Sequence, residues 1–206
     1  MLTASRHVYP RAPFPYEREH GQLLDNPYLD IWASLRSSRA QRAEDMTRAL
    51  LARDRAQLRR LKAERNEYTH RYAYAIPTLE ALEVLRKCAP LIEIGAGTGY
   101  WAWLLRQLGT DILCYDARPP ALEDDQNRFH ARTSCWTDVQ PGDERKLNEH
   151  PARTLFLCWP PPGESMARDT LCRYRGDTFL LRRRAAAAKR RHGSDGRSRV
   201  HRSLAD

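Results

Sequence analysis

Three closely spaced glycines form the part of the sequence best suited to hold a ligand. They lie in the run EIGAGTG, residues 93–99, between an apolar stretch and a stretch of helix-forming residues. Gly95 permits a tight turn, Gly97 lets a ligand approach bare backbone, and Gly99 allows a strand and a helix to pack closely. The helix N-terminus after Gly99 offers unpaired N–H groups to an anion. The run therefore predicts a ligand-binding turn between a strand and a helix.

Two acids accompany this turn. Glu93 stands two residues before Gly95, and Asp116 follows nineteen positions after Gly97, at the end of the next apolar stretch. Adjacent parallel strands bring Asp116 near the turn, where its carboxylate can accept from both hydroxyls of a ribose. A glycine turn can also serve packing alone, but three glycines with two placed acids favour a ligand.

Two classes of cofactor fit this pattern. A dinucleotide fingerprint GxGxxG would place its third glycine at position 100, where the sequence has Tyr100. Glu93 suits the ammonium of a cationic amino-acid ligand, received directly or through water, whereas a pyrophosphate gains nothing from a carboxylate. The acid therefore fits the cationic ligand better.

The glycine run together with Asp116 resembles the class I S-adenosylmethionine-dependent methyltransferases. Four further segments are similar to an uncharacterised methyltransferase-like group, namely YAIP at 74–77, GTGYW at 97–101, CWPPP at 158–162 and YRGD at 174–177. The resemblance covers residues 72–181, about half of the chain.

The resemblance implies a set of residues that bind S-adenosylmethionine. The glycines would line the methionine part, Glu93 would lie at the same end, and Asp116 would hold the ribose. The full implied set is Tyr74, Glu93, Gly95, Ala96, Gly97, Gly99, Tyr100, Asp116 and Ala117. Tyr74 equally suits packing or closing over the cofactor, whereas Tyr100 suits core or helix packing better than a catalytic role, because large aromatic side chains are usually buried.

The resemblance also implies that Trp159, Pro160 and Pro161 face the methyl group as catalytic residues. Amino-methyltransferases have Asp or Asn at the position of Trp159, and an indole cannot accept a hydrogen bond from an amine. Trp159 is instead expected to stack on a flat substrate or to cover the sulfonium by cation–π attraction. Methylation of a nucleobase amine is therefore disfavoured. The segment also has a plainer interpretation, in which the prolines merely end a strand.

Alternating apolar and helix-forming segments predict an α/β fold. We expect strands at 91–94, 111–115, 154–159 and 177–181, with a weaker strand at 129–133, and helices at 38–65, 78–88, 101–108 and 166–174. This alternation predicts a Rossmann-like, doubly wound and mostly parallel sheet. The expected C-terminal strands are missing from the sequence, because arginines and alanines follow Leu181.

Composition divides the chain into four parts. These are a Pro- and aromatic-rich segment at 1–37, a helical extension at 38–71, the Rossmann-like domain at 72–181 and a basic low-complexity tail at 182–206. Tyr28 is one of the aromatic residues expected to pack the first segment onto the domain. The loss of apolar pattern after Leu181 predicts that the Rossmann-like domain is incomplete at its end. The tail is expected to be disordered. The arginines of the helical extension indicate a solvated amphipathic helix rather than a nucleic-acid-binding one.

Charge and cysteine content exclude several classes of protein. The net charge is +9, but residues 182–206 supply +7 of it with nine Lys or Arg and two acids. No apolar run approaches the roughly 20 residues of a membrane span, and no secretory leader is evident. The five cysteines lack CxxC spacing, so we expect reduced thiols, a cytoplasmic protein and no metal site.

Three functional hypotheses follow. The first is an S-adenosylmethionine-dependent methyltransferase with an unknown acceptor. The second is a non-catalytic binder of the same cofactor, or a degenerate fold that keeps only the shape. The third is a nucleic-acid-associated protein that acts through the arginine-rich tail, with no membrane partner.

Overall fold

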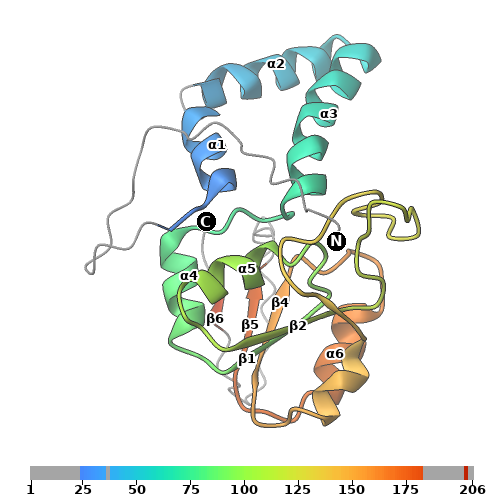
Figure 1. Ribbon diagram of the computed structural model, residues 1–206. Coiled ribbons are helices and arrows are strands. Elements are labelled where there is room, and N and C mark those ends of the chain that lie inside the picture. Colours follow the sequence, from blue (N-terminus) through green and yellow to red (C-terminus); the bar gives the residue numbers. More distant parts are fainter. Residues whose placement is uncertain (1–23, 36–37, 183–201, 204–206) are drawn as a thin grey trace, which may run out of the picture.

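A parallel β-sheet forms the centre of the computed structural model, which describes residues 24–35, 38–182 and 202–203 (Figure 1). Its six strands follow the order β3-β2-β1-β4-β5-β6, and each neighbouring pair is parallel. The strands are β1 Leu91–Ile94, β2 Ile112–Asp116, β3 Gln140–Pro141, β4 Thr154–Cys158, β5 Phe179–Arg182 and β6 Arg202–Ser203. The predicted α/β class is confirmed, and the strand order reverses between β1 and β4.

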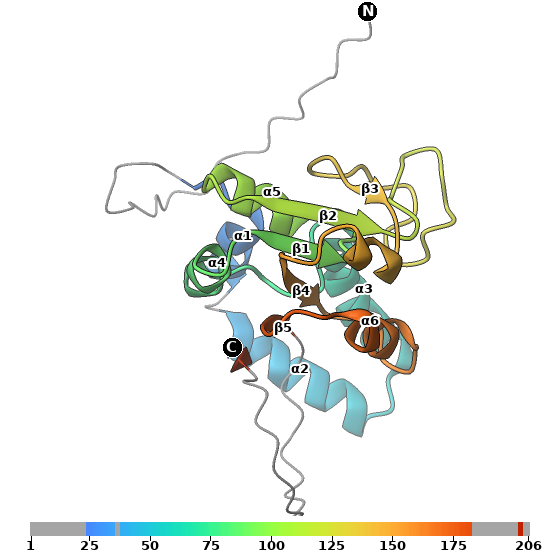
Figure 2. The same ribbon diagram turned by 90° about the horizontal axis from the view of Figure 1, so that it is seen from below.

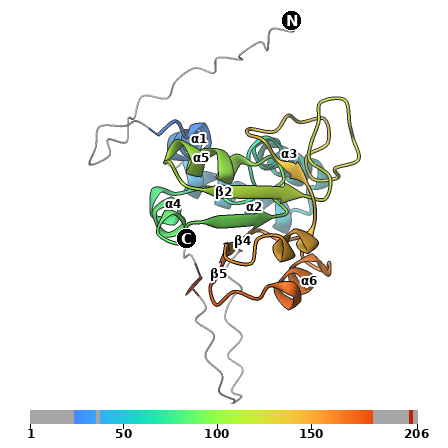
Figure 3. The same cartoon turned by 60° about the horizontal axis from the view of Figure 1, so that its bottom comes forward.

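Helices cover both faces of this sheet. The helices are α1 Pro27–Leu35, α2 Arg39–Leu51, α3 Arg55–Arg71, α4 Leu79–Arg86, α5 Tyr100–Gln107 and α6 Met166–Arg173, with a 3₁₀ helix, η2, at Glu144–Asn148. Figures 2 and 3 show α4 and α5 on one face of the sheet and α6 on the other. This arrangement is expected when helical connections join parallel strands.

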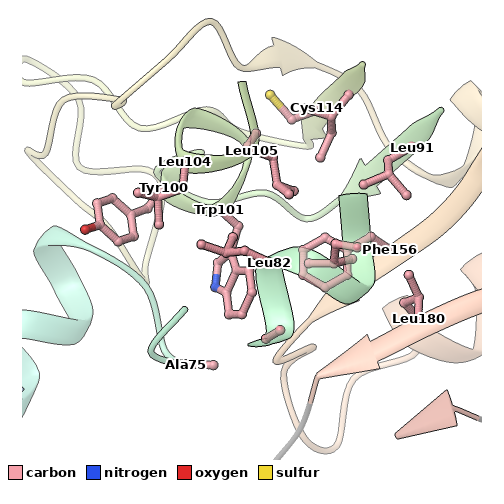
Figure 4. Close-up of a cluster of buried hydrophobic side chains, with 14 of the residues drawn as sticks. Ala75, Leu82, Leu91, Tyr100, Trp101, Leu104, Leu105, Cys114, Phe156 and Leu180 are labelled. Atoms are coloured by element: carbon pink, nitrogen blue, oxygen red, sulfur yellow. The ribbon is translucent and has the colours of Figure 1, made fainter. Parts of the chain in front are cut away.

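Alternation along the strands builds a separate core on each face. Leu91 and Phe156 pack with α4 and α5, whereas their neighbours Ile92 and Leu155 belong to the cluster that Met166 of α6 joins. Successive side chains of a strand point to opposite faces, so these central strands are mostly apolar on both faces, with the buried Glu93 as the charged exception in β1. Figure 4 shows the larger cluster, in which Trp101 and Phe156 lie with ring centroids 5.4 Å apart.

The helical extension is a hairpin of two helices, not the single helix predicted over 38–65. The chain breaks at Arg53, whose φ is +54°, and Asp54 then caps α3 by accepting from the backbone N–H groups of Ala56 and Gln57. An aspartate at this position satisfies N–H groups that a continuous helix would have used internally. The capping signal was present in the sequence but was hidden among strong helix formers.

Aromatic packing attaches α1 and the base of the hairpin to the sheet domain. The rings of Tyr28 and Tyr72 stack at 4.9 Å, and those of Tyr72 and Trp136 stack at 5.3 Å. The predicted packing of Tyr28 against the domain is thus confirmed. The other aromatic residues of segment 1–23 lie outside the described residues.

The strand predicted at 129–133 is wrong, because this segment forms turns. The Asn127 side chain accepts from the backbone N–H groups of Phe129 and His130, and Arg132 has a φ of +53°. Local hydrogen bonds of this kind compete with a strand ladder. The third strand in sequence is instead β3, which begins seven residues after the end of the predicted strand.

The C-terminal prediction is wrong at one place. The sequence suggested that no strand follows β5, but the two-residue strand β6 pairs with it in parallel. The rest of the predicted tail, residues 183–201 and 204–206, lies outside the described residues.

Candidate functional site

A cavity of about 250 Å³ lies where the carboxyl ends of β1, β2 and β4 meet. This is the point where the strand order reverses, and such points form a crevice in open α/β sheets. The cavity brings together ten of the predicted site residues, namely Tyr74, Glu93, Gly95, Ala96, Gly97, Asp116, Ala117, Trp159, Pro160 and Pro161. Segments far apart in the sequence therefore converge on one site.

Two predicted residues, Gly99 and Tyr100, are not among those that line the cavity. The fully buried Tyr100 phenol donates to Asn26 at 2.8 Å and accepts from the backbone N–H of Tyr28 at 3.1 Å. Gly99 caps α5 with a φ of +71°, and a Cβ there would lie 2.6 Å from Val139. Both residues join the helix to its surroundings, so packing explains them.

Asp116 is bound to the glycine turn. Its Oδ2 accepts from the Gly97 backbone N–H at 2.8 Å, and its Oδ1 accepts from that of Arg118 at 2.9 Å. Burial raises the pKa of Asp116, and the two backbone hydrogen bonds oppose that rise. Each carboxylate oxygen keeps a further lone pair, so the group can still accept from a ligand hydroxyl.

The chain's own side chains closely approach two of the glycines. A Cβ at Gly97 would lie 2.7 Å from Nε2 of His130, and one at Gly95 would collide with the Met166 methyl group. Both glycines have positive φ, +75° at Gly95 and +54° at Gly97. Sequence reasoning expected a ligand over Gly97, and the structure places the His130 ring there.

Glu93 is the most unusual acid of the cavity. It is only 1% exposed, and its Oε2 has no hydrogen-bond partner among the described residues. Burial raises its pKa to about 8, the charge of Asp116 adds to that rise, and Arg106 opposes it. A buried polar atom without a partner is costly, so the carboxylate is poised to receive a donor or a cation.

The whole cavity is rich in carboxylates. Five acids contribute to its wall, namely Glu93, Asp116, Asp143, Glu144 and Glu164, while no Lys or Arg within the described ranges does so. Asp143 pairs with Arg145, and Glu164 pairs with Arg128, so two of the five are partly neutralised. A cavity of this kind attracts cations and repels phosphates.

His130 is a cavity residue that sequence reasoning missed. Its Nδ1 lies 2.8 Å from the His70 carbonyl oxygen, which can only accept, so Nδ1 carries the proton. Burial lowers the pKa of His130, which leaves Nε2 as an acceptor at neutral pH. The sequence around His130 contains no motif that indicates a binding site. The position of His130 depends on the turn that the Asn127 side chain stabilises.

Trp159 adopts a strained backbone conformation at the end of β4. Its φ is +52°, and its backbone N–H donates to the Arg182 carbonyl at 2.6 Å. Positive φ is rare for a bulky residue and costs on the order of 1–3 kcal/mol. The hydrogen bond to β5 holds this conformation. The backbone changes direction at Trp159, and residues 159–161 then form part of the cavity wall.

Comparisons with protein-family models, curated proteins and solved structures gave no match for this chain. Among the described residues, no group of three or more His, Cys, Asp or Glu side chains is arranged to hold a metal ion. Every helix within the described ranges is too short or too polar to cross a membrane.

Proposed function

We propose that this cavity binds S-adenosylmethionine and that the chain is a methyltransferase. The observation that carries the proposal is the buried Glu93 carboxylate, whose Oε2 has no hydrogen-bond partner among the described residues and lies in a wall rich in acids. S-adenosylmethionine bears a sulfonium and an ammonium, so a cationic ligand of this kind would stabilise the ionised carboxylate. The strand order supports the Rossmann-like form of the fold that the resemblance implies.

The residues of the cavity fit the parts of this cofactor. Asp116 would accept from the ribose hydroxyls, and Glu93 would lie at the charged amino-acid end. Tyr74 and Phe129, whose rings meet edge to face at 6.1 Å, would supply an aromatic wall. The bound cofactor would supply an electrophilic methyl group on a good leaving group, so positioning would provide much of the rate.

Two further residues of the cavity wall bear on the acceptor, Trp159 at the end of β4 and His130 over Gly97. Trp159 offers an aromatic face and no acceptor atom, whereas Nε2 of His130 offers one lone pair. His130 is therefore the residue best suited to take a proton from an acceptor.

The acids of the wall argue against a dinucleotide. A pyrophosphate would meet a wall with five acids and no described Lys or Arg, although arginines outside the wall pair with two of the acids, Asp143 and Glu164. Tyr100 also occupies the position of the third fingerprint glycine and is engaged in the core.

Calorimetric titration of the full chain with S-adenosylmethionine and, in parallel, with NAD⁺ tests this proposal. We expect saturable binding of the first and none of the second. The variant Asp116→Asn should weaken binding about tenfold or more, because it halves the acceptor capacity toward the ribose. Asp111→Asn, on an exposed residue at the opposite end of β2, is the matched control and should bind like the parent chain. Absence of binding by a folded chain would refute the proposal.

A non-catalytic cofactor binder is the second candidate. It is favoured by the closeness of His130 and Met166 to the glycines, which leaves little free space at the turn. Incubation with methyl-labelled cofactor and fractionated lysate separates the two, since only an enzyme transfers label to an acceptor.

A further inference from the structure

The α2–α3 hairpin, called the arm below, projects away from the sheet domain (Figure 1). Backbone carbonyls at the end of α3 fix its base. His70 accepts from His130, Arg71 accepts from the Trp136 indole at 2.8 Å, and Tyr72 accepts from Thr98. The base is therefore firmly attached, while most side chains of the arm remain exposed.

The arm carries six exposed cations that form no ion pair with a described side chain. They are Arg53, Arg55, Arg59, Arg60, Lys62 and Arg65. Two acids, Asp54 and Glu64, lie in the same stretch of sequence, and Asp54 is used as the cap of α3. Sequence reasoning favoured a solvated helix at the edge of the domain, but a solvated surface usually mixes its charges.

The sheet domain pairs its surface cations in that ordinary way. Its ion pairs include Arg86–Glu83, Arg145–Asp143, Lys146–Glu149, Arg153–Asp111 and Arg168–Asp169. The arm has one such pair as well, Arg48–Asp45 on α2, whereas the described side chains at 53–65 form none.

Four of the six cations are spaced along α3 as a row. Arg55, Arg59, Lys62 and Arg65 follow one another at intervals of four, three and three, which places them on neighbouring turns of one side. At 1.5 Å per residue the row is about 15 Å long. Its far end approaches the cavity, since burial raises the pKa of Tyr74 in the cavity wall and the charge of Arg65 opposes that rise.

We infer that the arm is a docking surface for the phosphate backbone of nucleic acid. A row of unpaired cations matches a strand of regularly spaced phosphates and gains free energy by releasing counterions. A membrane surface fits less well, because an interfacial helix needs a broad apolar face. Within the arm, Leu50 and Leu51 are the large apolar side chains that are strongly exposed. The inference does not depend on the cofactor proposal.

The experiment measures anisotropy of a fluorescein-labelled 20-nucleotide single-stranded RNA titrated with the full chain at several salt concentrations. The arm variant is Arg55→Gln/Arg59→Gln/Lys62→Gln, and the matched tail variant is Lys189→Gln/Arg190→Gln/Arg191→Gln, which removes the same charge. We expect the arm variant to bind at least about tenfold more weakly, with a salt slope shallower by about 2, since each phosphate contact contributes about 0.7 on a single strand. The tail variant should keep most of the affinity.

A second arm variant, Arg53→Gln/Arg60→Gln/Arg65→Gln, should reproduce the loss. Glutamine is a good helix former and all these side chains are exposed, so circular dichroism and melting should stay unchanged. Equal losses in the arm and tail variants would overturn the inference, as would a loss confined to the tail variant. Failure of the parent chain to bind RNA would also overturn it, whether or not vesicles of phosphatidylserine and phosphatidylcholine bind.

Discussion

The cavity and the arm carry opposite charge. Acids line the cavity wall, whereas basic side chains outnumber acids on the arm. The cavity holds a buried carboxylate oxygen that has no hydrogen-bond partner among the described residues, whereas residues 53–65 of the arm hold exposed cations that form no ion pair with a described side chain. Residues 38–71 contain ten Lys or Arg against five acids, while residues 72–181 contain twelve against fifteen. The basic net charge therefore describes the arm and the tail, and the domain around the cavity is mildly acidic.

This difference shows that one net charge can conceal two surfaces with opposite preferences. The cavity favours a small cation in a desolvated site, where burial makes each charge expensive. The arm favours a polyanion in water, where screening makes the attraction dependent on salt. Substitutions in the two regions should consequently respond to different variables, pH for the cavity and ionic strength for the arm.

The largest effect is expected from Glu93→Gln on stability at high pH. The pKa of Glu93 is about 8 in the folded chain and near its ordinary 4.5 when unfolded, so the folded state holds the proton more tightly. Stability contributed by this group is therefore complete below about pH 4.5 and is lost as the pH rises to 8. The glutamine variant cannot ionise, so its unfolding free energy should exceed that of the parent by about 4 kcal/mol more at pH 8 than at pH 5.

Urea unfolding of both chains at pH 5 and pH 8 measures this difference directly. Glu80→Gln, on an exposed acid at the start of α4, is the control and should leave the pH dependence unchanged. Identical pH profiles for Glu93→Gln and the parent would show that the carboxylate is not destabilised inside the cavity.

The next effect concerns the glycines of the turn. Gly97→Ala combines a positive φ with a collision against His130, so we expect a loss of about 3 kcal/mol of stability. Gly109→Ala is the matched control, because Gly109 has a φ of +69° but open space around its Cα. It should lose about 1 kcal/mol from backbone strain alone. Equal losses in the two variants would mean that His130 does not constrain the turn.

The smallest effect is expected in the arm. Asp54→Ala removes the cap that accepts from Ala56 and Gln57, which should weaken α3 by about 1 kcal/mol. Hydrogen exchange should quicken at the start of α3 and stay unchanged in β1 and β4, because the tip of the arm lies apart from the sheet. Faster exchange in the sheet strands as well would show that arm and domain unfold as one unit.

Sequence patterns predicted the parts of the fold that depend on local apolar periodicity and glycine placement. The strands at 91–94 and 154–158 and the helix capped by Thr78 fall close to where the apolar runs predicted them. The break at Arg53 and the turns around Asn127 were missed, since both depend on one side chain bonding to nearby backbone. Such bonds leave little trace in periodicity.

The candidate site was predicted in outline from the glycine run, Asp116 and the Trp-Pro-Pro segment. His130 was missed because its relation to Gly97 depends on a long loop that returns to the turn. Tyr100 was assigned to the site although it lies in the core, because a motif position does not reveal the direction of a side chain.

The most direct test of the account is calorimetric titration of S-adenosylmethionine into the parent chain, Glu93→Gln and Glu80→Gln between pH 6 and 7.5. We expect the parent and Glu80→Gln to bind more tightly as the pH rises, because the bound cation favours the ionised form of Glu93 and its proton is released. Glu93→Gln should bind about tenfold or more weakly at pH 7.5 and show a flatter pH dependence. Binding by Glu93→Gln that equals the parent at every pH would contradict the assignment of Glu93, and an absence of binding in all three chains would contradict the proposed function.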